Sequence, residues 1–126
     1  MKFLHSMIRV KNPEESIKFY CGLLGLKEGK KVRLEDCDLL YLTDTVTGSE
    51  IELTINDDIP KDGYKNGNAF GHFAFECDDL DIISKKIKAL GYKFYEEPFY
   101  MPEIKTRICF LLDPDGNQIE LIEKRP

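Results

Sequence analysis

The sequence predicts an α+β fold in which a module of one strand, one helix and three further strands occurs twice. One repeated segment is G-S-E-I-E-L-T from Gly48, which recurs as G-N-Q-I-E-L-I from Gly116. Another starts at a histidine, because H-S-M-I-R-V from His5 and H-F-A-F-E-C from His72 each precede a helical pattern. The copies are offset by 66 to 68 residues, which indicates an internal duplication.

The first module opens with a strand, expected over residues 3–10, and continues into a helix. Asn12 is a good N-cap, Pro13 suits the first helical position, and Glu15 can complete a capping box. The helix is expected to run to about Leu24 and to pack one face on a sheet. Its predicted apolar stripe comprises Ile17, Tyr20, Cys21 and Leu24.

Three strands complete the first module. Residues 27–36 and 38–43 have the pattern of two antiparallel strands, and residues 44–48 form a turn before the strand that carries Glu52. Residues 57–68 are rich in Asp, Lys, Gly and Asn and have few apolar side chains, which is typical of a surface linker.

The second module repeats this order. His72 opens a strand, Asp78 or Asp79 caps the next helix, and Gly91 ends that helix as Gly25 ends the first. The strand is expected to present His72, Ala74 and Glu76 on its inner face. The stripe of the helix is expected to comprise Ile83, Ile87 and Leu90.

Two strands and a tight turn lead to the end of the second module. Strands are predicted near residues 92–96 and 106–112, and the stretch 97–105, with two prolines, is predicted to be a mobile loop. The turn D-P-D-G-N from Asp113 leads into a last strand. Alternation places Glu120 on the face opposite its apolar neighbours, where an ionised carboxylate needs a cation or a hydrogen-bond donor.

Size and charge limit the class of protein. A chain of 126 residues is long enough for one domain, here module 1–56 and module 69–126 joined by linker 57–68. A net charge of −5 with interspersed lysines argues against nucleic acid or an anionic membrane as partner and favours a small molecule. Four single cysteines and no signal peptide predict a cytoplasmic protein with free thiols.

The only two histidines of the chain, His5 and His72, occupy equivalent places in the repeats, as do Glu52 and Glu120. A duplicated fold brings equivalent strands around a pseudo-twofold axis, so we expect these four side chains to converge on one point. Two imidazoles and two carboxylates suit a divalent ion such as Zn²⁺, Ni²⁺ or Co²⁺, with coordination positions left open for a substrate.

The same segments carry a resemblance. H-S-M-I-R-V, F-Y-C-G-L-L-G-L-K, I-E-L-T-I-N, G-H-F-A-F-E and D-P-D-G-N-Q-I-E-L together resemble the glyoxalase I (lactoylglutathione lyase) family over nearly the whole chain. The resemblance implies the vicinal-oxygen-chelate fold of paired βαβββ modules. It also implies one divalent metal per site, bound by His5, Glu52, His72 and Glu120, and isomerisation of the methylglyoxal–glutathione hemithioacetal to S-D-lactoylglutathione.

The expected chemistry moves a proton between adjacent carbons through an enediolate, which requires a base and a Lewis acid. We expect Glu120 to be the main base and Glu52 its counterpart for the other substrate face. The short chain resembles the bacterial nickel- or cobalt-activated class, with zinc possible, and the family resemblance predicts a homodimer. Whether each site lies within one chain or is shared across the dimer is left open by the sequence.

Substrate contacts are predicted on the same strands. Arg9 lies four residues after His5, and Asn56 lies four after Glu52, so each shares a strand face with a proposed ligand. Arg9 resembles the family's contact to a glutathione carboxylate. Further predicted contacts are Asn68, Lys105 and Arg107. The alternative function is another metalloenzyme of the superfamily, such as an acyl-CoA epimerase, or a thiol transferase or resistance protein.

Overall fold

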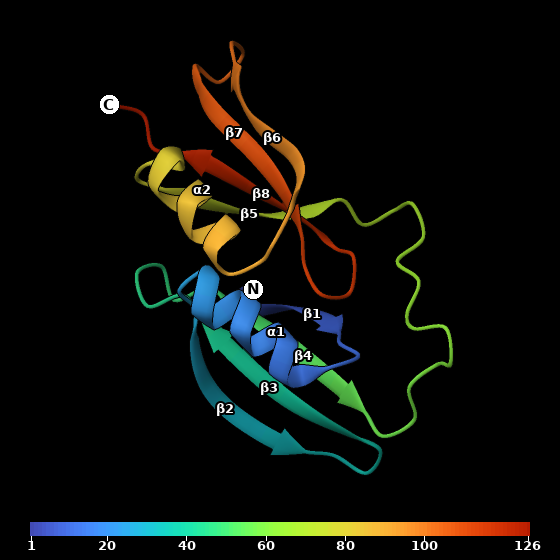
Figure 1. Ribbon diagram of the computed structural model, residues 1–126. Helices are drawn as coiled ribbons and strands as arrows, with labels where there is room; N and C mark the ends of the chain where they lie inside the picture. The colour runs from blue at the N-terminus through green and yellow to red at the C-terminus, as the bar shows by residue number, and fades with distance from the viewer. The chain divides into compact units, whose positions relative to one another are not determined.

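The computed structural model describes residues 1–126, which form two compact units, Met1–Lys65 and Asn66–Pro126. Each unit has one four-stranded sheet and helical structure between its first and second strands (Figure 1). The α+β class and the repeated βαβββ order predicted from the sequence are therefore confirmed. None of the helices is long and apolar enough to span a membrane.

The first unit has its strands in the order β1-β4-β3-β2. Strand β1 is parallel to β4, and the other neighbours are antiparallel. The elements are β1 (His5–Arg9), α1 (Pro13–Ile17), the π-helix η1 (Lys18–Leu23), β2 (Lys27–Arg33), β3 (Cys37–Thr43) and β4 (Glu50–Asn56).

The helix of the first unit begins where the sequence predicts. Asn12 accepts a hydrogen bond from the Glu15 N–H at 3.2 Å, and Gly25 has a φ of +80° just after the helix. The predicted stripe is wrong by one residue, because the fully buried side chains are Ser16, Phe19, Tyr20 and Leu23. Residues 19–24 are apolar at every position but Gly22, so two adjacent stripes fit the sequence equally well.

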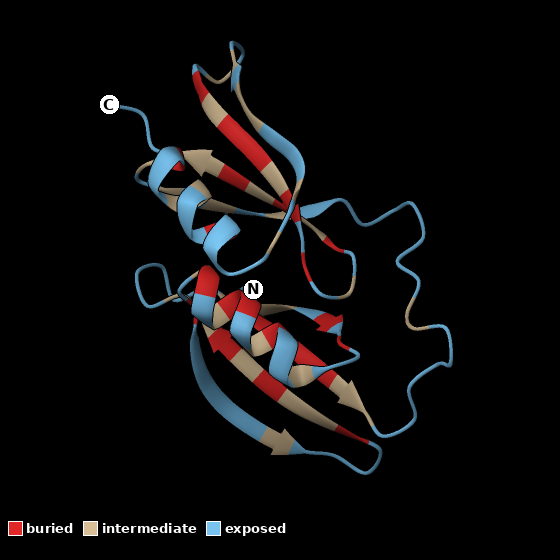
Figure 2. Ribbon diagram, viewed as in Figure 1, coloured by how far each residue is buried: buried red, intermediate tan, exposed pale blue.

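The second unit has the matching order β5-β8-β7-β6, with β5 parallel to β8. Its elements are β5 (His72–Cys77), α2 (Leu80–Ala89), β6 (Phe94–Met101), β7 (Thr106–Leu112) and β8 (Gln118–Glu123). Buried residues concentrate on β3, β4, β7 and β8, the two central strands of each sheet, while the edge strand β2 is almost fully exposed (Figure 2).

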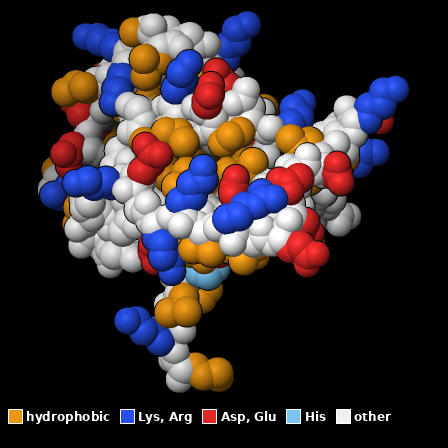
Figure 3. Space-filling view, turned by 90° about the horizontal axis from the view of Figure 1, so that it is seen from below, with side chains coloured by type: hydrophobic (Ala, Val, Ile, Leu, Met, Phe, Trp, Pro, Cys, Tyr) orange, Lys and Arg blue, Asp and Glu red, His pale blue; other side chains and the backbone are white.

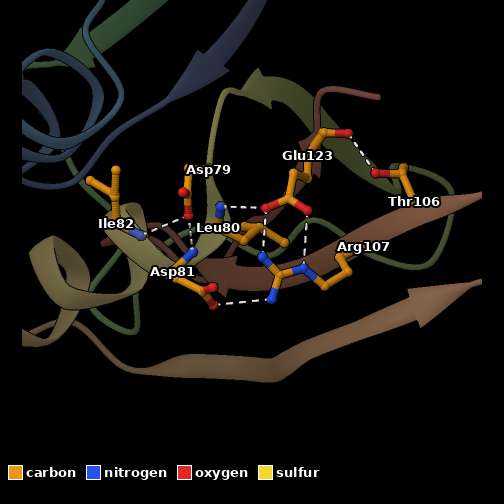
Figure 4. Close-up of polar contacts among 7 residues, drawn as sticks. All are labelled: Asp79, Leu80, Asp81, Ile82, Thr106, Arg107 and Glu123. Atoms are coloured by element: carbon orange, nitrogen blue, oxygen red, sulfur yellow. Dashed lines mark hydrogen bonds and ion pairs between the residues drawn. The ribbon is translucent and has the colours of Figure 1, made fainter. Parts of the chain in front are cut away.

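Helix α2 is held at its first turn by two carboxylates (Figure 4). Asp79, one of the two predicted caps, accepts hydrogen bonds from the N–H groups of Asp81 and Ile82, and Glu123 accepts one from the Leu80 N–H at 2.7 Å. The stripe prediction is wrong for Leu90, which is 51% exposed, because the helix ends at Ala89 and the chain turns away.

The mobile loop predicted over residues 97–105 is also wrong, since β6 extends to Met101 and only residues 102–105 form a turn. Pro98 lies at a register irregularity in this edge strand, between the pairs that Glu96 and Phe99 form with β7. A proline is tolerated there because an edge strand and a bulge both leave backbone N–H groups unpaired.

The turn before β8 is built around Asp113, which is buried. Its carboxylate accepts hydrogen bonds from the backbone N–H groups of Asp115 and Asn117 and from the Asn117 side chain, which also contacts Asn66. Gly116 has a φ of +86°, which explains the glycine at this point of the turn. This turn fixes where β8 starts and thereby the register of Glu120.

The segment after β4 has no strand or helix until β5 begins at His72. Its start is tied to β2 by Arg33, whose guanidinium contacts the Asp57 carboxylate through two nitrogens at 2.7 and 2.5 Å. Both side chains are half exposed, so this pair orients the segment more than it stabilises the fold.

Candidate metal centre

The first unit places His5 against Glu52, with 2.8 Å between Nε2 of the imidazole and Oε2 of the carboxylate. Strand pairing explains the contact: β1 runs parallel to β4 with Met7 opposite Glu52, so His5 and Glu52 project from the same face of the sheet two positions apart. The apolar side chains Ile8, Val10, Leu40, Leu42, Ile51 and Leu53 occupy the other face and are buried.

The second unit repeats this arrangement with His72 and Glu120. The His72 Nε2 lies 3.1 Å from the Glu120 Oε2, and Ala74 stands opposite Glu120 in the parallel β5–β8 pair as Met7 stands opposite Glu52. We call His5–Glu52 the first pair and His72–Glu120 the second pair. In both, the carboxylate is the more buried partner, with 10% and 14% of its side chain exposed.

An aromatic ring stands edge-on to each histidine. Tyr41 contacts His5 with ring centroids 5.4 Å apart at an interplanar angle of 83°, and Phe110 contacts His72 at 5.6 Å and 79°. Tyr41 on β3 pairs directly with Glu52 on β4, and Phe110 on β7 pairs directly with Glu120 on β8. The hydrogen bond to Glu52, followed by burial and the charges of Glu52 and Glu50, raises the pKa of the Tyr41 hydroxyl.

The donor set fits a divalent metal ion. Each pair offers one imidazole nitrogen and one largely buried carboxylate. Within each unit, no third His, Cys, Asp or Glu lies close enough to form a group of three candidate metal ligands. Nitrogen and oxygen donors without thiolates are typical of catalytic rather than structural metal sites. Each pair therefore supplies two candidate protein ligands.

Two predicted substrate contacts share the sheet face of the first pair. Arg9 lies four residues after His5 on β1 and is exposed, and Asn56 lies four residues after Glu52 on β4. Side chains alternate along a strand, so an even spacing places each residue on the same face as its histidine or glutamate. The side-chain oxygen of Asn56 accepts a hydrogen bond from the Tyr64 hydroxyl at 3.2 Å. No sequence motif selected Tyr64 or Tyr41, because the position of Tyr41 depends on strand register and that of Tyr64 on the path of the segment after β4.

The structure does not bring Arg107 to the second pair. Phe110 pairs with Glu120 on the neighbouring strand, so the two side chains share one face of the sheet. Arg107 lies three residues before Phe110, and because side chains alternate along a strand, its side chain lies on the other face. There its guanidinium contacts Glu123 at 2.7 and 3.0 Å and Asp81 at 3.0 Å (Figure 4). These contacts fit a structural function at the start of α2.

Lys105 and Asn68 lie outside the regular elements. Lys105 is exposed in the turn between β6 and β7, with a φ of +56°, and is five residues from Phe110, a separation of roughly 17 Å along a strand. Asn68 is exposed in the segment before β5. Acidic and basic side chains are interspersed on the face shown in Figure 3, as the mixed sequence pattern predicts.

Comparison with known proteins identifies the family. Residues 2–121 match the model of the Glyoxalase/Bleomycin resistance protein/Dioxygenase superfamily. The chain belongs to this superfamily. The chain is 36% identical to a relative named lactoylglutathione lyase from Neisseria meningitidis. The match covers 99% of the present chain and 92% of the relative.

Solved structures of the superfamily agree with this assignment. A glyoxalase I from Zea mays is 34% identical with a TM-score of 0.85, and the match covers 98% of the present chain but only 44% of the maize chain. A glyoxalase I from Leishmania major, described as trypanothione-dependent, is 30% identical with a TM-score of 0.79 and is covered over 86% of its length. The resemblance derived from the sequence motifs is therefore confirmed.

Proposed function

We propose that this superfamily member is a lactoylglutathione lyase that isomerises the hemithioacetal of methylglyoxal and glutathione to S-D-lactoylglutathione, a detoxification reaction. The observation that carries the proposal is the repeated His–Glu pair, one on the polar sheet face of each unit. Full-length similarity to proteins named lactoylglutathione lyase supports the same reaction.

The metal ligands in this proposal are His5, Glu52, His72 and Glu120. A bound divalent ion supplies a Lewis acid for the negative charge that develops on the substrate oxygens during proton transfer. The nickel- or cobalt-activated class is favoured for a chain of this length, and zinc is the alternative. Ligand identity alone does not select among these ions, because imidazole and carboxylate donors serve all three.

The proton transfer is assigned to Glu120. Its carboxylate removes the proton from the carbon that bears the sulfur and hydroxyl, which leaves an enediolate, and returns a proton to the adjacent former carbonyl carbon. No electrons are lost or gained overall, so the reaction requires no redox cofactor. Glu52 is the counterpart that faces the opposite side of the substrate.

The thiol part of the substrate is proposed to contact Arg9 and Asn56, which share the sheet face of the first pair. A guanidinium recognises a carboxylate through two parallel hydrogen bonds, which suits the carboxylates of glutathione. Asn68 and Lys105 remain secondary candidates for this contact. Arg107 is assigned to the support of α2 instead, because two carboxylates already occupy its donors.

The proposed assembly is a homodimer with two equivalent metal sites, located in the cytoplasm. Residues 1–126 are proposed to form one domain made of the two modules. A complete centre needs one copy of each pair, and the two pairs belong either to one chain or to two.

The direct test is to incubate the purified protein with methylglyoxal and glutathione in the presence of divalent metals and to identify the product. Formation of S-D-lactoylglutathione, lost in Glu120→Gln, is the expected result. Parallel assays with trypanothione and other thiols define the cosubstrate. Epimerisation of an acyl-CoA, or addition of a thiol to an antibiotic, without any hemithioacetal isomerisation would instead assign the chain to another activity of the superfamily.

A further inference from the structure

Two hydrogen-bond donors at one end of the polar sheet face of the first unit have no partner within that unit. They are the exposed guanidinium of Arg9 on β1 and the side-chain nitrogen Nδ2 of Asn56 on β4. Strand pairing places Arg9 opposite Thr54, and Asn56 follows Thr54 by two residues on the same face. Asn56 lies roughly 13 Å along β4 from Glu52, so this end of the face is separate from the first pair.

The Tyr64 hydroxyl determines which end of the Asn56 amide faces outward. It donates a hydrogen bond to the Asn56 Oδ1 at 3.2 Å, and both side chains are half-buried. An amide has its acceptor oxygen and its two N–H donors on separate branches, so an oxygen bound to Tyr64 directs the N–H groups away from it. Asn56 is therefore presented as a donor.

The segment between Asn56 and Tyr64 is anchored to the first unit along its length. At its start, the Asp57 N–H donates to the Asp36 carbonyl oxygen at 3.0 Å. Near its end, Gly63 has a φ of +77°, and the Lys11 Cδ lies 3.7 Å from the position that a Cβ of Gly63 would occupy. These contacts hold the residue before Tyr64 against the end of β1, from where the tyrosine side chain reaches Asn56.

We propose that Tyr64 is a positioning residue, which orients the Asn56 amide so that its N–H groups, together with the Arg9 guanidinium, bind a carboxylate of the glutathione part of the substrate. The identity of this ligand rests on the proposed function. A carboxylate offers only acceptors, so it matches a subsite made of donors, whereas the reversed amide would place an oxygen against it. Tyr64 does not contact the substrate and acts through Asn56.

The experiment measures binding of S-methylglutathione, which cannot react, to the full chain in the presence of Ni²⁺ by calorimetry. Tyr64→Phe removes only the hydroxyl, and Tyr95→Phe removes a hydroxyl from an exposed position on β6 as the matched control. We expect about threefold to tenfold weaker binding for Tyr64→Phe, the usual effect of one lost hydrogen bond, and wild-type binding for Tyr95→Phe.

Two further measurements distinguish positioning from general support of the fold. Tyr64→Phe should cause no additional loss of affinity in an Asn56→Ala background, because no amide remains to be oriented. The same substitution should not change the affinity for S-methylglutathione esterified at both carboxylates. An additional loss in the double variant, or an equal loss for the diester, would assign Tyr64 to the support of the fold and overturn the proposal.

Turnover gives an independent readout. Tyr64→Phe should raise KM for the hemithioacetal by the same factor as it weakens binding and leave kcat unchanged, because the subsite is remote from the reacting carbons. Wild-type affinity of Tyr64→Phe for S-methylglutathione would overturn the positioning function even if the isomerase is active, and failure of the wild type to bind this compound would reject the subsite. Binding that depends on Tyr64 in a protein without isomerase activity would instead retain the subsite and reject the proposed reaction.

Discussion

Each proposed ligand is a separate test at the residue scale, and His72 is the most informative because it occupies the more exposed pair. His72→Ala removes an imidazole nitrogen and should lower the metal content of the purified protein and weaken rebinding by at least about tenfold. The unfolding midpoint of the metal-free protein should change little, because this side chain is 41% exposed. Unchanged metal stoichiometry, measured by elemental analysis, would contradict the four-ligand model.

The sequence was sufficient to select the four ligand candidates, because a duplication places His5 and His72, and Glu52 and Glu120, at matching positions. It was not sufficient to find the partners around them. Tyr41 becomes relevant only when β3 is paired with β4 in the observed register, and register is a tertiary property of the sheet. The same limitation applies to Arg107, whose selection as a substrate contact took no account of the sheet face on which it lies.

At the scale of elements, the contact between Arg107 and Glu123 joins β7, β8 and the start of α2. Hydrogen bonds from Arg107, and then from the Leu80 N–H, lower the pKa of Glu123. A glutamate has a pKa of about 4.3 in the unfolded chain, and the lower pKa of Glu123 in the folded protein stabilises the fold at pH values above about 4.3. This stabilisation is lost as the pH falls through the folded-state pKa.

Replacement of Glu123 should therefore have a pH-dependent effect on stability. Glu123→Gln is expected to cost about 1–2 kcal/mol of unfolding free energy near pH 7, since it weakens hydrogen bonds to a partly buried carboxylate. The difference from the wild type should shrink as urea unfolding is repeated at pH values falling below about 4.3, because the unfolded wild-type carboxylate then becomes protonated and the stabilisation declines toward the folded-state pKa. Glu103→Gln, in the exposed β6–β7 turn, is the control and should show neither effect. A pH-independent cost for Glu123→Gln would reject the electrostatic explanation.

Local signals predicted the helix starts and most strands, because Asn12, Asp79 and the Asp113 turn act through short-range hydrogen bonds. The errors arose where tertiary packing decides. Strand β6 continues through Pro98 since pairing with β7 outweighs the local preference for a loop. The first helix buries a stripe one residue away from the predicted one because its apolar residues offered two choices.

At the scale of the whole molecule, the open question is which chains contribute the two pairs to a centre. Mixing the inactive variants His5→Ala and Glu120→Ala under conditions of subunit exchange distinguishes the alternatives. If each centre combines the first pair of one chain with the second pair of its partner, heterodimers contain one intact centre, and up to about half of the dimers should form this active species. Exchange without any recovered activity would show that both pairs of a centre belong to one chain.

The central claim is that His5, Glu52, His72 and Glu120 together bind one catalytic divalent ion, and metal reconstitution tests it most directly. Chelated protein is titrated separately with Ni²⁺, Co²⁺ and Zn²⁺ while bound metal and hemithioacetal isomerisation are followed in the same samples. We predict no activity without metal and full activity at one ion per chain, with Ni²⁺ or Co²⁺ the most effective. Full activity with Zn²⁺ and none with Ni²⁺ would contradict the predicted metal class, and full activity in the metal-free protein would contradict the claim itself.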